Sequence, residues 1–362
     1  MKRAHDEHDA VLPVDRRLPE PAKARLFSAL EPAVVVTELG EQPHSPSSPV
    51  EEGDAFVVAT SGTTGEPRGV VLTRDAVRAS ALASSRRLAV EPTIDRWLCC
   101  LPLAHVGGLS VVMRALQTNT PLEIHGSFDA DRARKAARQR GASLVSLVPT
   151  ALARLGEDAA LFRLILLGGS AMPKSRPTNT VATYGMTETG SGVVYDGWPL
   201  DGVEIRIGDD DEIELRGPML LRCYRGAGDP KDKDGWFRTG DAGRLTDDGR
   251  LEVFGRLTEV IRTGGESVYP AAVESVLRSH PAVAEVAVLG APDLEWGERV
   301  VAYVEPAPDC SPSLEELREF VSAELGPVFA PREVVVAPLP RTAIGKVRRD
   351  ALRRQVVNEA LA

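Results

Sequence analysis

A short loop rich in glycine and hydroxyl residues is the stretch of this sequence best suited to bind a phosphate group. It runs from Thr60 to Gly69 in the order Thr-Ser-Gly-Thr-Thr-Gly-Glu-Pro-Arg-Gly and follows the apolar run Ala55–Ala59, which predicts a short buried strand. Glycine lets the backbone curve around an anion, and N–H groups and hydroxyls donate to phosphate oxygens. The Lys-Ser/Thr pair of a Walker A loop is missing, since Pro67 and Arg68 follow the last turn. Taken alone, the loop also fits an ordinary surface turn.

Apolar strands and amphipathic helices alternate after this loop, which argues for a largely parallel α/β sheet. The predicted elements are helices at 73–88 and 128–140 and strands at 96–101, 143–148 and 164–167. From Val203 the pattern changes to short alternating segments separated by aspartate-rich turns, which predicts a small β-rich subdomain. We therefore predict an α/β protein with a large N-terminal domain at 1–255, built on mostly parallel sheets plus that subdomain. A small mobile α+β domain at 256–362 is predicted to follow it.

The composition is that of a globular protein. The 362 residues are 43% hydrophobic and carry a formal net charge of −9, which argues against nucleic acid or an anionic membrane as the main partner. No apolar run approaches the ~20 residues of a membrane span, and no apolar signal core follows Met1. Cys99, Cys100, Cys223 and Cys310 lack metal-ligand spacing, so we expect reduced, structural thiols. These features predict a cytoplasmic protein without stable membrane insertion.

The loop resembles the phosphate-binding signature of the adenylate-forming enzymes, the acyl-CoA synthetase and luciferase superfamily. Only Arg68 departs from that signature, because it stands where the family usually has lysine. Arginine keeps the positive charge and can bind phosphate through two N–H groups. The resemblance implies that the loop binds ATP through the following residues: Thr60, Ser61, Gly62, Thr63, Thr64, Gly65 and Arg68.

The run Thr183–Glu188, Thr-Tyr-Gly-Met-Thr-Glu, resembles a second motif of the same family. The resemblance implies that Tyr184 stacks on the adenine beside Gly185, that Thr187 bonds the α-phosphate and that Glu188 binds Mg²⁺. A carboxylate is a suitable ligand, since Mg²⁺ prefers oxygen atoms and is commonly shared with nucleotide phosphates. The alternative interpretation makes Glu188 an ordinary surface residue.

Two further matches concern the pocket for the adenine and the acyl group. Gly168, Gly169 and Ser170 resemble the floor of that pocket in the family. His105, in the run Pro-Leu-Ala-His-Val-Gly-Gly-Leu, matches a family position near the acyl group. A histidine packed over the core is the alternative for His105.

The second half of the chain carries matches to the ribose and coenzyme A sites. Asp241 occupies the family's ribose-binding position, and Arg256 matches a second contact to ribose or phosphate. Asp241 by itself would also fit a turn. Gly264 and Gly265 resemble the loop that lines the pantetheine channel when the thioester forms, and glycine permits close approach of backbone to a narrow ligand.

Lys346 stands in the register of the family's catalytic lysine, within the run Pro340–Val347. Joining a carboxylate to AMP builds negative charge on the α-phosphate in the transition state. A pre-placed ammonium group stabilises that charge, an effect worth ~3–4 kcal/mol for a single donor. The alternative is a solvated lysine near the C-terminus. After adenylation, the segment beyond Arg256 is expected to rotate, withdraw Lys346 and present the Gly264–Gly265 loop to the thiol of coenzyme A.

A narrower resemblance concerns the acid. The short segment before Thr60 and the runs Leu144–Thr150 and Thr183–Ile205 are similar to the compact, actinobacterial-type o-succinylbenzoate–CoA ligases of menaquinone biosynthesis. The resemblance implies that the protein converts o-succinylbenzoate to its CoA thioester. Because this substrate is a dianion, a basic residue should meet its second carboxylate. Arg154 and His105 are the candidates, and the sequence does not choose between them.

Other functions remain open at the level of sequence. One is a CoA ligase for a different aryl or fatty acid, and another is an adenylating enzyme that loads a carrier protein. A third is a weakly active nucleotide-binding relative, suggested by Arg68 and the shortened N-terminal part. The predicted partners are a small carboxylic acid, ATP with Mg²⁺ and coenzyme A, with no nucleic acid, and the sequence allows a homodimer.

Overall fold

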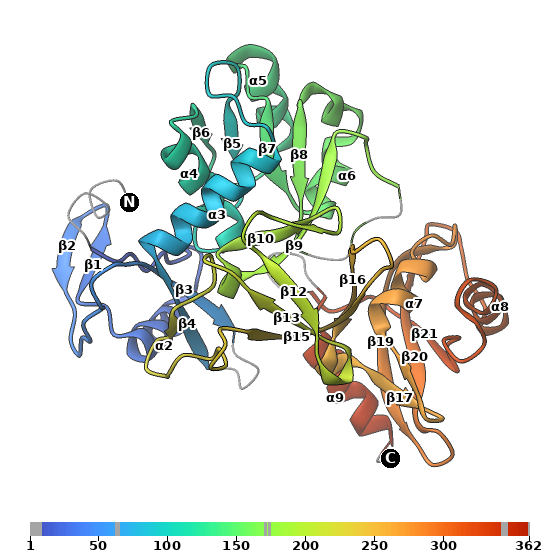
Figure 1. Ribbon diagram of the computed structural model, residues 1–362. Coiled ribbons are helices and arrows are strands. Elements are labelled where there is room, and N and C mark those ends of the chain that lie inside the picture. The colour runs from blue at the N-terminus through green and yellow to red at the C-terminus, as the bar shows by residue number, and fades with distance from the viewer. Residues whose placement is uncertain (1–8, 62–65, 170–171, 173–174, 342–346, 361–362) are drawn as a thin grey trace. The chain divides into compact units, whose positions relative to one another are not determined.

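The protein folds as two units in a computed structural model that describes residues 9–61, 66–169, 172, 175–341 and 347–360 (Figure 1). Unit 1 comprises residues 1–206, 214–238 and 246–251, and unit 2 comprises residues 207–213, 239–245 and 252–362. Within the described ranges, every helix is too short or too polar to cross a lipid bilayer.

The centre of unit 1 is a seven-stranded sheet with the order β11-β10-β9-β8-β7-β5-β6 (Figure 1). Its strands are β5 (Trp97–Cys99), β6 (Leu122–Ile124), β7 (Leu144–Leu147), β8 (Leu164–Leu167), β9 (Thr180–Met186), β10 (Ser191–Tyr195) and β11 (Trp198–Pro199). Strands β9, β8, β7, β5 and β6 run parallel, whereas β10 returns antiparallel to β9. The parallel part joins strands that are separated by helices in the sequence, as predicted from their alternation.

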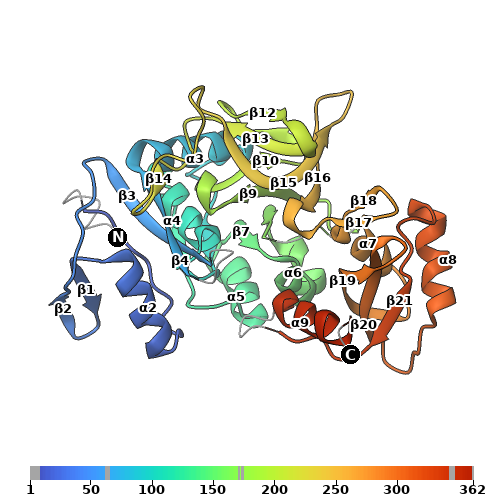
Figure 2. The same ribbon diagram turned by 90° about the horizontal axis from the view of Figure 1, so that it is seen from below.

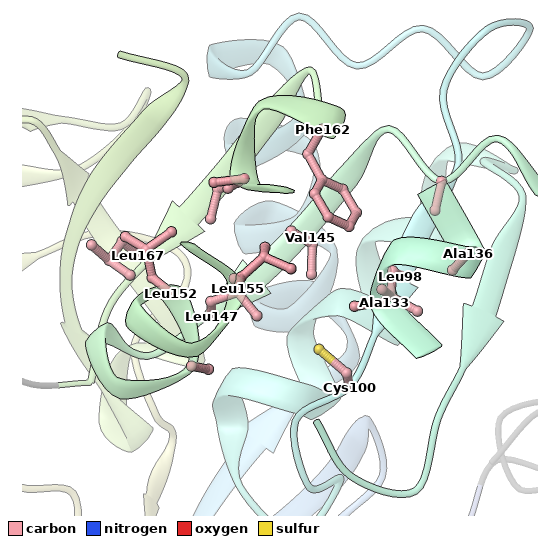
Figure 3. Packing of buried hydrophobic residues seen from close by; sticks show 14 residues of the cluster. Leu98, Cys100, Ala133, Ala136, Val145, Leu147, Leu152, Leu155, Phe162 and Leu167 are labelled. Carbon is pink, nitrogen blue, oxygen red and sulfur yellow. The ribbon is translucent and has the colours of Figure 1, made fainter. Parts of the chain in front are cut away.

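Helices cover both faces of this sheet, and the alternation of strand side chains decides what each face contacts. Helices α5 (Ala130–Arg140) and α6 (Pro149–Leu155) pack on the face that carries Leu98 and Cys100 (Figure 3). Helices α3 (Arg74–Arg87) and α4 (Val106–Thr118) cover the opposite face, where the Cys99 thiol donates to the Gly108 carbonyl at 3.5 Å. Burial raises the pKa of the Cys99 thiol to about 11 and that of Cys100 to about 12, as expected for structural thiols.

A smaller antiparallel sheet in unit 1 has the order β14-β4-β3. Its strands are β3 (Asp54–Ser61), β4 (Pro67–Thr73) and β14 (Cys223–Tyr224). Helix α2 (Glu20–Leu30) packs on it through Leu26 and Leu30, and a hairpin of β1 (Val34–Thr37) and β2 (Gly40–Pro43) follows that helix. The buried strand predicted at Ala55–Ala59 is therefore confirmed as part of β3, and the glycine-rich loop joins it to β4.

A four-stranded sheet has the order β12-β13-β15-β16. Its strands are β12 (Glu204–Ile207), β13 (Glu212–Arg216), β15 (Phe237–Leu245) and β16 (Leu251–Arg256). This sheet corresponds to the small β-rich subdomain predicted from the change of pattern at Val203. Strand β15 is longer than the pattern indicated and contains Asp241.

Unit 2 contains a five-stranded sheet with helices on both faces (Figure 2). Its strands are β17 (Ile261–Thr263), β18 (Glu266–Val268), β19 (Val283–Asp293), β20 (Gly297–Pro306) and β21 (Glu333–Val336). Helices α7 (Pro270–Leu277) and α8 (Leu314–Leu325) pack on one face, and α9 (Arg349–Ala360) places Leu352 on the other. The Ser313 hydroxyl caps α8 by accepting from the Glu316 amide at 3.2 Å, and the Glu316 side chain completes a capping box.

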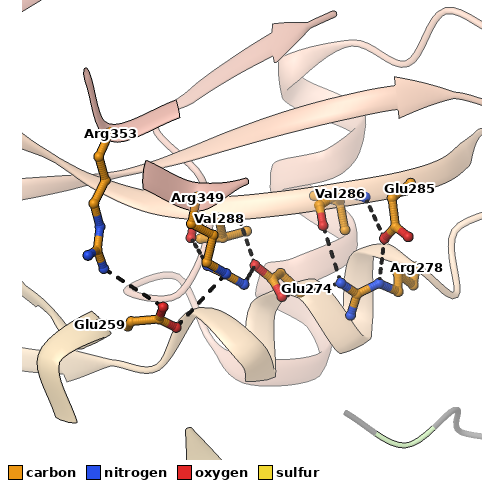
Figure 4. Close-up of polar contacts among 8 residues, drawn as sticks. All are labelled: Glu259, Glu274, Arg278, Glu285, Val286, Val288, Arg349 and Arg353. Carbon is orange, nitrogen blue, oxygen red and sulfur yellow. Dashed lines mark hydrogen bonds and ion pairs between the residues drawn. The ribbon is translucent and has the colours of Figure 1, made fainter. Parts of the chain in front are cut away.

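Strand β19 lies at the edge of this sheet, and charged side chains cover its open backbone groups (Figure 4). Glu274, whose side chain is only 3% exposed, accepts from the Val288 amide at 2.8 Å. Arg349 donates to the Val288 carbonyl at 3.0 Å, and Arg278 donates to the Val286 carbonyl at 3.2 Å. Both arginines also pair with the Glu274 carboxylate. Glu274 is thus a buried acceptor shared by α7, α9 and β19.

The predicted fold class, α/β with a β-rich subdomain and an α+β C-terminal part, is confirmed. Several elements were not predicted, and helix α4 and strand β4 are two of them. Helix α4 begins just after His105 and is interrupted in sequence by two early glycines, so its helical pattern is weak at the start. Strand β4 follows a proline and is too short to show a clear period.

Candidate active site

The predicted phosphate loop connects two paired strands. Thr60 pairs with Arg68 and Ser61 pairs with Pro67 across the β3–β4 hairpin. The intervening residues Gly62, Thr63, Thr64 and Gly65 lie outside the described residues. Just past the loop, a side chain at Gly69 would place its Cβ 2.7 Å from Leu30 Cδ2, so a larger residue there would require the Leu30 side chain to shift.

Glu188 lies in a short helical turn, η2 (Thr187–Thr189), between β9 and β10. The half-buried carboxylate accepts a hydrogen bond from the Tyr224 hydroxyl at 2.9 Å. The main-chain carbonyl of Glu188 accepts a hydrogen bond from the Leu221 amide at 2.7 Å. Both the main chain and the side chain of Glu188 are therefore held in place, and its role as a magnesium ligand stays a prediction.

The hairpin that carries Tyr184 and Gly185 is tightly closed. A Cβ at Gly185 would lie 2.2 Å from the Ser191 carbonyl oxygen, so only glycine fits. The Thr189 hydroxyl bonds the Met186 carbonyl and the Ser191 carbonyl at 2.9 Å and 2.6 Å. These contacts fix the chain between Tyr184 and Glu188, which is the segment predicted to contact the nucleotide.

Tyr224 links Glu188 to the phosphate loop and was missed by sequence reasoning. Its ring lies 5.9 Å from the guanidinium carbon of Arg68, within the range of a cation–π contact. Arg68 and Glu188 are far apart in sequence, and the structure brings both to one tyrosine. No spacing pattern marks Tyr224, because its register depends on the pairing of β14 with β4.

The remaining unit 1 residues lie at the carboxyl ends of strands or helix starts. Gly168 and Gly169 directly follow β8, and a Cβ at Gly168 would lie 2.5 Å from the Thr183 hydroxyl oxygen. Ser170 lies outside the described residues. Ligands of parallel α/β sheets bind beyond the carboxyl ends of the strands, which is where these glycines stand. His105 is exposed at the N-cap of α4, so the alternative of a core histidine is wrong.

The structure does not single out a partner for a second substrate carboxylate. Arg154 lies in α6 with its guanidinium 5.4 Å from the Phe128 ring. His105 belongs to a different helix. Neither contact identifies the acid, so both candidates stay predictions.

In unit 2 the structure joins Asp241 and Arg256. Asp241 lies within β15 with 7% exposure, and Arg256 Nε is 3.0 Å from its Oδ1 atom. Arg256 also donates to the Thr239 carbonyl at 3.0 Å. Asp241 is therefore a buried strand residue, and its interpretation as a turn residue is wrong. A carboxylate of this kind can accept charge-assisted hydrogen bonds from the two hydroxyls of a diol.

Replacing Asp241 with asparagine is expected to raise the KM for ATP about tenfold, since a charged acceptor is replaced by a neutral one. The initial rate of pyrophosphate release, measured at a series of ATP concentrations, gives this KM. Asp248→Asn is the matched control, because Asp248 pairs with Arg250 in an exposed turn. An unchanged KM in Asp241→Asn would remove Asp241 from the nucleotide site.

The predicted pantetheine loop is the turn of the β17–β18 hairpin. Gly264 and Gly265 have positive φ values of 59° and 85°, a conformation that glycine adopts without strain. A Cβ at Gly264 would lie 2.7 Å from the Trp296 ring, and the Gly264 amide donates to the Trp296 carbonyl at 2.9 Å. Trp296 was not predicted to belong to this loop.

Lys346 lies outside the described residues, but the chain on both sides of it is anchored. Arg341 and Val347 form a bridge, and the Arg348 amide donates to the Pro340 carbonyl at 2.7 Å. Arg349 binds the buried Glu274. The described residues on either side of 342–346 are therefore bonded to each other, and Arg349 is bonded to α7 within unit 2.

A short turn just after Arg256 contacts the helix that follows Lys346. Glu259 comes shortly after Arg256, in a short turn, η4 (Leu257–Glu259). Its carboxylate lies 3.9 Å from Arg349 and 3.9 Å from Arg353 of α9 (Figure 4). The residues just after Arg256, where the predicted rotation would begin, are thereby joined to α9.

A family model described as AMP-binding enzyme matches residues 4–225, and one described as AMP-binding enzyme C-terminal domain matches residues 272–346. The chain belongs to the AMP-binding enzyme family. The predicted recognition as an adenylate-forming enzyme is confirmed, and the second match ends at Lys346. The individual roles given to the site residues stay predictions.

Relatives in this family agree with the chain over nearly its whole length. It is 39% identical to a probable 2-succinylbenzoate–CoA ligase of Mycobacterium tuberculosis, over 94% of this chain and 95% of that protein. It resembles o-succinylbenzoate CoA synthetase of Bacillus subtilis in complex with the acyl-adenylate intermediate, with a TM-score of 0.77 and 30% identity over 97% of this chain and 80% of the other. The same enzyme with ATP and magnesium gives a TM-score of 0.78 and 31% identity over 97% and 81%.

The donor atoms in unit 1 fit a magnesium ion that is shared with ATP. Glu188 offers a hard carboxylate oxygen, and Mg²⁺ in nucleotide sites commonly takes only one or two carboxylates plus phosphate oxygens. Accordingly, no group of three or more histidine, cysteine, aspartate or glutamate side chains forms a metal cage in the part of the chain that the structure describes. Arg68 adds positive charge at the end of the phosphate loop.

Proposed function

We propose that this protein is an ATP-dependent, AMP-forming ligase that converts o-succinylbenzoate to o-succinylbenzoyl-CoA through an acyl adenylate. The observation that carries the proposal is the likeness along the whole chain to ligases of that name, including one with the acyl adenylate bound. The tyrosine-linked pair of Arg68 and Glu188 supports the nucleotide half of the reaction.

In the first half-reaction, the substrate carboxylate attacks the α-phosphate of ATP and pyrophosphate leaves. Arg68 and the loop beside it bind the phosphates, and Thr187 donates its hydroxyl to the α-phosphate. Glu188 would hold Mg²⁺, which neutralises phosphate charge when it is bound. Asp241 accepts from the ribose hydroxyls, and Lys346 supplies a positive charge where the α-phosphate gains negative charge.

In the second half-reaction, the thiol of coenzyme A attacks the acyl carbon and AMP leaves. Gly264 and Gly265 would line the path of the pantetheine arm, because a turn without side chains leaves room for a narrow ligand. The segment after Arg256 turns between the two halves, so that Lys346 withdraws before the thiol approaches. We infer this motion because unit 2 carries residues for both halves.

Pyrophosphate release with ATP, Mg²⁺ and o-succinylbenzoate, with and without coenzyme A, tests the proposal against a panel of benzoates and fatty acids. Turnover restricted to o-succinylbenzoate and dependent on coenzyme A is the expected result. Turnover with a different acid would keep the mechanism and change the substrate. Transfer of the acyl group to a carrier protein but not to coenzyme A would change the proposed acceptor. No pyrophosphate release with any acid would favour a weakly active nucleotide-binding relative.

The location and assembly of the protein belong to the same proposal. A cytoplasmic ligase meets ATP and coenzyme A where both are abundant, and small-molecule substrates require neither nucleic acid nor a membrane. Cell fractionation tests the location. Light scattering on the purified protein tests whether it forms a homodimer.

A further inference from the structure

The segment 221–225 of unit 1 holds Glu188 at two points. The Leu221 amide donates to the Glu188 carbonyl at 2.7 Å, and the Tyr224 hydroxyl donates to the Glu188 carboxylate at 2.9 Å. We propose that Tyr224 is a positioning residue that orients the Glu188 carboxylate toward the magnesium ion bound with ATP. This inference rests on the proposed function, because that function makes Glu188 the metal ligand.

Tyr224 is itself firmly placed. It lies in β14, which pairs with β4 directly beyond the phosphate loop. On one side, Arg222 binds both carboxylate oxygens of Asp54 at 2.9 Å, and the Asp54 side chain is only 1% exposed. On the other side, Arg225 donates to three main-chain carbonyl groups. The tyrosine hydroxyl therefore cannot move far from Glu188 unless the hydrogen bonds of Arg222 and Arg225 break.

The hydrogen bond leaves Glu188 free to bind a metal ion. A carboxylate has two oxygens with about four lone-pair sites, and the tyrosine uses one site on Oε1. The remaining sites stay available, while rotation of the carboxylate about its last bond is restricted. Groups that orient a metal ligand in this way typically change metal affinity 10- to 100-fold when they are removed.

The ring of Tyr224 adds a connection to the phosphate loop. Arg68 lies over the ring with 5.9 Å between the guanidinium carbon and the ring centroid. One side chain thus contacts both the metal ligand and the cation of the loop. Phenylalanine would keep the ring contact and remove only the hydroxyl, so the two effects can be separated.

The test is Tyr224→Phe, with Mn²⁺ in place of Mg²⁺. Mn²⁺ is titrated into the full-length protein with equimolar ATP and no acid, and free Mn²⁺ is followed by electron paramagnetic resonance. The same titration of ATP alone is the reference, because ATP itself binds Mn²⁺, and the difference between the two curves gives the metal affinity of the protein–ATP complex. We expect the dissociation constant to rise about tenfold. The Mg²⁺ concentration for half-maximal pyrophosphate release should rise by a similar factor, while the KM for the acid at saturating Mg²⁺ stays unchanged.

Tyr195→Phe is the matched control, since it removes a hydroxyl from the β9–β10 hairpin that carries Glu188. Tyr195 bonds Ser84 at 2.6 Å and Arg114 at 3.3 Å in a buried network. It should lower thermal stability without shifting metal affinity. The titrations are compared only between variants whose melting temperatures lie well above the temperature of the measurement.

Two outcomes separate this inference from the proposed function. If the wild-type protein binds Mn²⁺ with ATP and Tyr224→Phe binds it equally well, the positioning role is wrong and the function stands. If the wild-type protein binds neither Mn²⁺ nor ATP, the proposed function is wrong, and the positioning role of Tyr224 is wrong as well. Added to Glu188→Gln, Tyr224→Phe should have no further effect on metal affinity, because the hydroxyl acts through the carboxylate.

Discussion

Replacing Lys346 with alanine is expected to slow formation of the acyl adenylate about 10²- to 10³-fold, or roughly 3–4 kcal/mol in the activation free energy. The reason is the loss of a positive charge where the α-phosphate gains negative charge. The second half-reaction should survive, because the thiol attack needs the Gly264–Gly265 loop and not the lysine. Pyrophosphate release measures the first half, and thioester formation from a supplied acyl adenylate measures the second.

Lys135→Ala is the matched control for this variant. Lys135 is exposed on α5 and has no part in the proposed chemistry, so both half-reactions should proceed at the wild-type rate. Equal rates of adenylation in Lys346→Ala and wild type would show that the lysine is a solvated surface residue. Equal losses in both half-reactions would point to a folding defect instead of a missing charge.

Glu274→Ala is expected to lower the free energy of unfolding of unit 2 by about 3 kcal/mol, at the lower end of the cost of breaking a buried ion pair. Glu274 is buried and accepts from Arg278, Arg349 and the Val288 amide. Its loss leaves three donors without their acceptor. The two arginines are 37% and 25% exposed, so water can solvate them in part, which is why the lower end applies.

Denaturant unfolding with limited proteolysis measures this effect and locates it in unit 2. Glu285→Ala is a suitable control, because Glu285 pairs with the same Arg278 but its side chain is 26% exposed. We expect that change to cost less than about 1 kcal/mol, as for other exposed pairs. A smaller loss in Glu274→Ala than in Glu285→Ala would contradict the role of Glu274 as the shared buried acceptor.

Much of the fold could be predicted because local signals agreed with the final structure. Gly141 ends α5 with a positive φ of 70°, and Thr73 caps α3 by accepting from the Ala76 amide at 3.1 Å. Both features are visible in sequence as helix boundaries. Three of the parallel strands, β5, β7 and β8, were predicted because each is a short apolar run between helices.

The site could be predicted only where residues lie in contiguous motifs. Glu188, Asp241 and Lys346 each stand in a recognisable run, whereas Tyr224 and Glu274 act through partners that are distant in sequence. The link from Tyr224 to Glu188 depends on the register of β14 against β4, and a two-residue strand has too little sequence to specify register. Likewise, Glu274 looks like an ordinary helix glutamate until α9 and the edge of β19 are placed around it.

The cover on the edge of β19 also bears on how the protein behaves in solution. An open strand edge is a template onto which the strand of another molecule can add, and this is a common start of aggregation. Here a neighbouring strand would have to displace Glu274 and Arg349 from the Val288 backbone. Arg349 begins the helix just beyond Lys346, so a proteolytic cut between them would expose the edge as well as the apolar face under Leu352. Protein clipped at that point should precipitate although it keeps Lys346, and an intact C-terminal helix therefore protects solubility.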